Sequence, residues 1–152
     1  MSNGADKSKQ FLGVGIAMTP TVDPQGRVVG MDMGLDAQGH VALSSYDDHV
    51  LQSILLIVKT SPGERVMRPD FGAGLSTLAF EPLGSATAAL VQHRVTQALT
   101  RFEPRIDVLA LDVKPSSPAN PGELVITLRY RVRRTDTITN VVFPFFLERG
   151  RV

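Results

Sequence analysis

The chain contains no cysteine. A disulfide framework, a thiolate zinc site and a cysteine nucleophile are therefore all excluded. Long hydrophobic runs are absent as well, because the longest apolar stretch, 54–58, is far shorter than the ~20 residues that span a bilayer. The first ten residues are polar and lack the apolar region of a secretory signal. We expect a protein that does not insert into a membrane and that stays in the cytoplasm unless a larger particle carries it.

An excess of one charge sign is also missing. The chain has 16 Lys and Arg against 15 Asp and Glu, which gives a formal net charge of +1. This balance argues against a general binder of nucleic acid or anionic lipid. Hydrophobic residues make up 43% of the 152 residues, enough for the core of one domain. We predict a disordered lead-in over 1–10 and a single domain over 11–152.

The first part of that domain, 11–43, is expected to form an N-terminal hairpin extension. It contains two turn signals, Asp23-Pro24-Gln25-Gly26 and Asp36-Ala37-Gln38-Gly39. Asp supplies local hydrogen bonds in such turns and Gly supplies the positive φ angle. The sequence therefore predicts one or two short hairpins around these turns.

Two segments show apolar residues at helical spacing. The first, 46–58, follows Ser45, which is a good N-cap, and ends before Pro62-Gly63. The second runs over 85–102 and is stopped by Pro104. Between the helices, 61–83 has three glycines and three prolines and is expected to be an ordered loop. Five apolar residues should attach this loop to the core: Val66, Phe71, Leu75, Leu78 and Phe80.

Three strands are predicted after the second helix, over 106–114, 123–134 and 138–147. In the first, Leu109, Leu111 and Val113 make the better core row. The second alternates strictly, with Arg129, Arg131 and Arg133 on its polar face. The third contains Pro144, which cannot donate to a ladder, so it should lie at a sheet edge. The fold class is α+β: two main helices packed on a small antiparallel sheet of C-terminal strands, with N-terminal hairpins.

Candidate catalytic residues are few. Glycoside hydrolysis needs two carboxyl groups ~5–9.5 Å apart, and Glu64, Asp70, Glu81 and Glu103 could in principle supply a pair. However, Glu64 stands beside Arg65 and Glu103 lies close to Arg105, which is typical of ion pairs. The three histidines, His40, His49 and His93, lack the spacing of a metal site. No catalytic residue, metal or cofactor is predicted.

One stretch points to a family. Residues 57–72, IVKTSPGERVMRPDFG, closely resemble the hallmark of the lysozyme-like baseplate wedge family of contractile tails. Its loop-structuring residues are Gly63, Glu64, Arg65, Pro69, Phe71 and Gly72. Further matching motifs follow in order: Phe80-Glu81-Pro82, Glu103-Pro104-Arg105, Leu128-Arg129-Tyr130-Arg131-Val132 and Asn140-Val141-Val142-Phe143-Pro144-Phe145. The resemblance covers about 44–148, and 11–17 look most like the branch found in extracellular contractile injection systems.

The resemblance implies a structural role in the inner baseplate. Such a protein joins the wedge proteins around the tail tube or hub, in six copies, and initiates the sheath by strand exchange. The wedge contact falls on Glu103, Pro104 and Arg105, where Glu and Arg present opposite charges to the helical core bundle of the wedge. The alternative for this triad is a helix stop with a local salt bridge. The contact with the sheath protein falls on the C-terminal sheet, through Arg129, Arg131, Val141, Phe143 and Phe145.

Two other functions stay open at this point. The family's lysozyme label suggests a peptidoglycan hydrolase, which would need Glu64 or Glu103 as a catalytic carboxyl group. A regulatory adaptor on the same fold is the third possibility. For the sheet itself, the alternative to partner binding is that Arg129, Arg131 and Arg133 form a solvated face and 138–147 simply completes the sheet.

Overall fold

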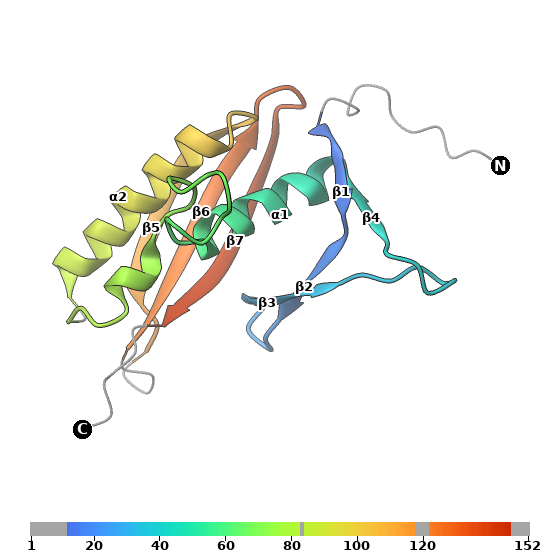
Figure 1. Ribbon diagram of the computed structural model, residues 1–152. Coiled ribbons are helices and arrows are strands. Elements are labelled where there is room, and N and C mark those ends of the chain that lie inside the picture. The colour runs from blue at the N-terminus through green and yellow to red at the C-terminus, as the bar shows by residue number, and fades with distance from the viewer. Residues whose placement is uncertain (1–11, 83, 118–121, 147–152) are drawn as a thin grey trace.

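The computed structural model describes residues 12–82, 84–117 and 122–146, so the predicted lead-in lies outside the described residues. Two helices, α1 (Tyr46–Lys59) and α2 (Ser85–Phe102), pack on one face of an antiparallel sheet (Figure 1). Its strands are β5 (Ile106–Pro115), β6 (Glu123–Val132) and β7 (Thr137–Phe146), in the order β5-β6-β7. The α+β prediction and the two helices are confirmed.

Both helices bury a stripe of apolar side chains. In α1, Val50, Ile54 and Leu55 are buried, and Asp47 and Asp48 in the first turn suit the positive end of the helix dipole. In α2 the buried stripe consists of Thr87, Val91, Val95, Ala98 and Leu99. The two stripes meet the sheet in one continuous hydrophobic core.

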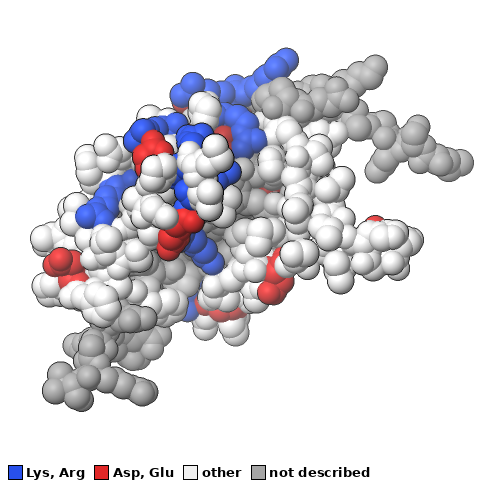
Figure 2. Space-filling model, viewed as in Figure 1, with Lys and Arg blue, Asp and Glu red and all other residues white. Residues whose placement is uncertain are grey.

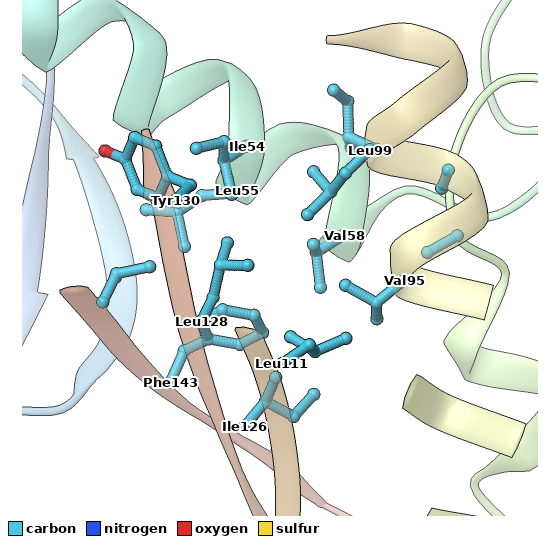
Figure 3. Close-up of a cluster of buried hydrophobic side chains, with 14 of the residues drawn as sticks. Ile54, Leu55, Val58, Val95, Leu99, Leu111, Ile126, Leu128, Tyr130 and Phe143 are labelled. Atoms are coloured by element: carbon cyan, nitrogen blue, oxygen red, sulfur yellow. The ribbon is translucent and has the colours of Figure 1, made fainter. Parts of the chain in front are cut away.

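The central strand β6 supplies the sheet's contribution to that core. Its alternate residues, Leu124, Ile126, Leu128, Tyr130 and Val132, are almost fully buried. Figure 3 shows Tyr130 and Leu128 on the side of the sheet that faces Ile54 and Leu55 of α1, with Ile126 beside Leu111. The predicted alternation of this strand is therefore confirmed, and it fixes which face of the sheet the helices cover.

The strand β5 changes face part-way along. The register with β6 shifts between Val108 and Ala110, which marks a β-bulge. An extra residue in a strand moves the following side chains to the opposite face. Leu111 and Val113 are each 8% exposed, as predicted, but Leu109 is 44% exposed. The prediction that Leu109 belongs to the core row is wrong because the bulge interrupts the alternation there.

The connection between the helices is an ordered loop with one 3₁₀ turn, η2 (Leu75–Leu78). Phe71, Leu75 and Leu78 are buried, as expected. Val66 and Phe80 are 87% and 75% exposed, so their predicted attachment to the core is wrong. A hydrogen bond from the Gly63 N–H to the Pro69 carbonyl (2.8 Å) closes the loop at its base, and the residues between them project away from the core.

An N-terminal arm, defined as residues 12–45, extends from the start of α1 (Figure 1). Strand β1 (Val14–Ile16) pairs with β4 (Leu43–Ser45), and β2 (Met18–Val22) pairs with β3 (Val28–Met33), both antiparallel. The two predicted turns are present. Asp23 accepts hydrogen bonds from the N–H groups of Gln25 and Arg27, and Asp36 accepts those of Gln38 and His40. The predicted hairpins are confirmed.

Within the described ranges, neither α1 nor α2 combines the length and the apolar character needed to cross a membrane.

Candidate partner-binding sites

The Glu103-Pro104-Arg105 motif occupies the junction between α2 and β5. Glu103 is the C-cap of α2, and its N–H donates to the Leu99 carbonyl at 2.9 Å. Its side chain is only 2% exposed and is bound by two nitrogens of the Arg105 guanidinium, with Arg105 Nε donating to Glu103 Oε1 at 2.5 Å. Glu103 therefore does not present its charge to solvent, contrary to the expectation. Burial without this partner would be costly for a carboxylate, and the local salt bridge weighed as an alternative is present.

Arg105 also holds the N-terminal arm in place. Its Nη1 donates to the Leu12 carbonyl, and its Nη2 donates to Ser53 Oγ in α1 at 3.0 Å. One guanidinium thus joins the arm, α1 and the end of α2. Pro104 is the exposed member of the triad, and it lines a shallow pocket of about 410 Å³ together with Arg65 and Phe71. Of the three residues, Pro104 is the one placed to touch a partner.

His49 lies in the same pocket, beneath β1 of the arm. Burial lowers the pKa of His49 below its usual value, and the nearby positive charge of Arg105 lowers it further, with a partial offset from Glu103. Its Nδ1 is buried and finds no hydrogen-bond partner among the described residues. These surroundings favour the neutral form of the imidazole.

The loop motif at 63–72 consists of residues with local structural roles. Glu64 accepts a hydrogen bond from the Ser61 N–H through Oε2 at 2.9 Å, which fixes the start of the loop just after α1. The guanidinium of Arg65 lies 4.5 Å above the centroid of the Phe71 ring. Gly72 has φ 107°, and a Cβ at this position would lie 2.1 Å from the Thr60 carbonyl oxygen. Only glycine fits such a close approach of two backbone segments.

The sheet face opposite the helices carries an ion-pair network. Arg131 and Arg133 both bond Asp107, at 3.1 and 2.8 Å. The hydrogen bond from Arg131 lowers the pKa of Asp107, and the bond from Arg133 adds to this effect against the opposing influence of burial. Arg129 is exposed on the same strand. The ion pairs with Asp107 hold Arg131 and Arg133 in place while both side chains stay at least partly exposed.

The predicted sheath-contact residues of β7 divide into two groups. Val141 and Phe143 are buried under the helices, so their side chains are not available to a partner. Phe145 is half-buried beside a pocket of about 190 Å³, which is also lined by Val58, Leu75 and Pro144. Within the described sheet β7 pairs only with β6, so its outer edge is not paired to another strand of that sheet, although β3 of the arm packs against part of β7. The edge position predicted from Pro144 is confirmed.

Three of the four candidate carboxylates are bound by local partners. Glu64 and Glu103 have the local partners described above, and Asp70 binds Arg101 at 2.5 Å. Glu81 lies in the exposed end of the loop. The described residues contain no group of three or more His, Asp or Glu side chains that could hold a metal ion.

The sequence did not predict the ion pair that joins the N-terminal arm to the sheet. Arg27, just after the first arm turn, binds Asp23 at 2.5 Å and Glu123 at 2.7 Å, and also reaches Ser116. The contact between Arg27 and Asp23 is local and belongs to the predicted Asp23-Pro24-Gln25-Gly26 turn. Nothing in the sequence pairs Arg27 with a residue at the start of β6.

The family comparison fits this architecture. The model of the family described as "Baseplate wedge protein gp25" matches residues 44–137, from β4 to the start of β7. Baseplate wedge protein gp25 of Enterobacteria phage T4 is 32% identical over 111 residues, which are 73% of this chain and 77% of that protein. The chain belongs to the gp25 family of baseplate wedge proteins. As a member, it is a structural component of the wedge in a contractile tail or tail-like particle.

Solved structures extend the similarity of this gp25-family chain. A Geobacter sulfurreducens protein with a provisional assignment as a tail lysozyme is 40% identical, with a TM-score of 0.65, covering 73% of this chain and 99% of that one. A chain of the six-fold symmetrised anti-feeding prophage baseplate is 21% identical, with a TM-score of 0.56, covering 95% and 94%. That coverage shows the same fold over more of the chain than the family model matches.

Proposed function

We propose that this wedge component is not an enzyme and that it starts the sheath. In this proposal it joins the other wedge proteins around the tube or hub, in a ring of six copies, during assembly in the cytoplasm. The outer edge of β7, where β3 of the arm does not cover it, then pairs with a strand of the first sheath subunit. The observation that carries the proposal is this edge, because an unpaired strand edge accepts a partner strand through backbone hydrogen bonds.

The geometry supports strand pairing rather than side-chain insertion. Val141 and Phe143 face the core and stabilise β7 itself, so the sheath contact falls on the backbone of the strand, with Phe145 and the adjacent pocket beside it. Each backbone hydrogen bond would contribute about 0.5–1.5 kcal/mol net. A rigid edge strand gives the first sheath subunit a fixed position before any contact between sheath subunits exists.

Deletion tests the proposal at the level of the particle. Without the protein, electron micrographs should show tubes or baseplates that lack an extended sheath. Normal sheathed particles in the deletion strain would contradict the proposed role.

A lysine on either edge tests which strand is used. Ile138 is exposed on β7, and Leu109 is exposed on β5 at the other edge of the same sheet. A charged side chain on an edge strand hinders pairing. We expect Ile138→Lys to abolish sheath assembly and Leu109→Lys to permit it. The reverse pattern would move the contact to β5, and normal sheaths in both variants would rule out strand exchange.

The proposed wedge contact is tested best at Pro104. Replacing Glu103 and Arg105 would also release the arm, since Arg105 binds Leu12 and Ser53. Pro104→Glu leaves the ion pair in place and alters only the exposed position. It should prevent co-purification with wedge proteins at an unchanged melting temperature, whereas Pro82→Glu, also at an exposed proline, should not. Wild-type binding by Pro104→Glu would remove the triad from the interface.

The hydrolase alternative has one supporting observation, the provisional assignment of the Geobacter relative. The roles of the carboxylates oppose it, because Glu64 accepts a hydrogen bond from the Ser61 N–H in the loop and Glu103 is buried in an ion pair. The purified protein should not clear purified sacculi. Clearing that is lost in Glu64→Gln or Glu103→Gln would instead establish the enzyme.

A further inference from the structure

Four arginines gather on one side of the molecule, where the loop after α1 faces the C-terminal half of α2. Figure 2 shows Lys and Arg side chains concentrated over this region. We call this surface the arginine face and define it by Arg65, Arg68, Arg94 and Arg101. None of these residues belongs to β7 or to the Glu103-Pro104-Arg105 triad.

Three of these arginines are ordered by aromatic rings. Phe71 and Phe102 pack with their ring centroids 5.0 Å apart. The guanidinium of Arg65 lies 4.5 Å from the Phe71 centroid, and those of Arg101 and Arg68 lie 5.0 and 6.0 Å from the Phe102 centroid. Stacking uses the flat side of a guanidinium and leaves the N–H donors at its rim available. Ordered donors of this kind suit two-point binding of a carboxylate.

The arginine face has more positive than negative charge. Among the described residues, Asp70 is the carboxylate that pairs with it, at 2.5 Å from Arg101 and 3.9 Å from Arg68. Arg94 donates through Nη1 alone, to the Gly74 carbonyl at 2.8 Å and to Thr77 Oγ1 at 2.6 Å. Its Nε and Nη2 therefore have no partner within the described part of the chain.

A pocket on this surface lies between the loop that follows α1 and the C-terminal half of α2. It has a volume of about 510 Å³ and is lined by Arg94, Arg101, Asp70, Ser76, Thr77 and Gln97, among others. The lining is part polar and part apolar, and Arg94 and Arg101 contribute to it from positions about two turns apart on α2. The two guanidinium groups make this pocket suitable for acidic side chains.

We propose that the arginine face is a docking site for an acidic segment of another protein. Asp or Glu side chains of that segment bind Arg94 and Arg101 in the pocket, and further carboxylates bind Arg65 and Arg68 on its rim. Charge complementarity identifies the partner. A nucleic acid fits less well, because a formal net charge of only +1 supplies no long-range attraction for a phosphate chain. A short acidic segment needs only the arginines of this face. The proposal does not depend on strand exchange at β7.

The test uses the purified full-length protein and a fluorescein-labelled poly-glutamate peptide, with binding followed by fluorescence anisotropy. Arg94→Gln combined with Arg101→Gln should weaken binding by roughly tenfold, the effect expected when paired guanidinium–carboxylate contacts are lost. The matched control is Arg129→Gln combined with Arg133→Gln, which removes the same charge from the sheet face. It should change binding by less than about twofold, and circular dichroism should show both variants folded.

Three results would overturn the proposal. The first is absence of binding by the wild-type protein at low salt. The second is equal weakening in the two double variants, which would mean that the peptide responds only to net charge. The third is tighter binding of a labelled oligothymidine than of the peptide, which would assign the surface to nucleic acid. A weaker effect of Arg94→Lys with Arg101→Lys than of the Gln pair would support the site, because lysine keeps the charge.

Discussion

The Nη1 atom of Arg27 donates a hydrogen bond to Oε1 of Glu123 at 2.7 Å, although 96 residues separate the two in the chain. The Glu123 side chain is 2% exposed. This contact fixes the β2–β3 hairpin to the start of β6, at the opposite end of the arm from the contact between Arg105 and Leu12. The arm is therefore held at two points by arginines.

The ion pair between Arg27 and Glu123 should be tested by replacing Arg27 alone and then both residues. Arg27→Met leaves the buried Glu123 carboxylate without this cation and should lower the melting temperature by several degrees. Arg27→Met combined with Glu123→Leu removes both charges and should recover part of the loss. Thermal unfolding followed by circular dichroism measures both. A double variant less stable than the single one would show that the ion pair is not what matters here.

Gly72→Ala should be among the most damaging small substitutions. The new Cβ would lie 2.1 Å from the Thr60 carbonyl oxygen, and φ is 107°. We expect a loss of more than about 3 kcal/mol in the free energy of unfolding, since backbone strain alone costs about 1–3 kcal/mol. Gly63→Ala is the matched control, because its φ is 92° but no atom lies within 4 Å of the added Cβ. Urea denaturation compares the two, and similar losses would contradict the steric explanation.

Acidification should weaken the junction through His49. Burial and Arg105 lower the pKa of His49 in the folded protein, whereas an unfolded histidine titrates near ~6.5. Below that pH the unfolded chain binds the additional proton, so the free energy of unfolding falls as pH falls, until the folded His49 is protonated too. His49→Gln should flatten this part of the profile, and the same change at exposed His93 should not. An unchanged pH profile in His49→Gln would exclude this linkage.

The bulge in β5 makes a prediction about neighbouring leucines. Leu111→Ala should cost about 2–5 kcal/mol, the usual range for a buried leucine. Leu109→Ala should stay within about 0.5 kcal/mol, because its side chain is largely in solvent. The comparison uses urea denaturation of the two variants. Equal costs would mean that the alternation of β5 continues through Val108 and Ala110.

Local patterns predicted most of the secondary structure. The helical spacing in α1 and α2, the alternation in β6 and the missing N–H of Pro144 each depend on residues close together in the chain. Leu109 was misplaced because a bulge arises from pairing with β6 and leaves no mark in the alternation of β5 itself. Val66 was misplaced because the hydrogen bond between Gly63 and Pro69 turns the loop outward.

The candidate sites were less predictable than the fold. The family resemblance pointed to Glu103, Pro104 and Arg105, but only the structure shows that Glu103 is buried and that Pro104 is exposed. The arginine face went unnoticed because its members come from two segments, and each looks like an ordinary surface charge in the sequence. Only tertiary contacts place Arg65 and Arg68 beside Arg94 and Arg101.

The two anchors of the N-terminal arm have a consequence for synthesis on the ribosome. Leu12 binds a residue 93 positions later, and Arg27 binds one 96 positions later. At the usual rate of about 5–20 residues per second, roughly 5–20 s separate the synthesis of the arm from the synthesis of β6. During that interval Leu12 and Val28, which are 0% and 6% exposed in the folded protein, lack the neighbours that bury them. Chaperone contact with the nascent chain should therefore be concentrated on the arm.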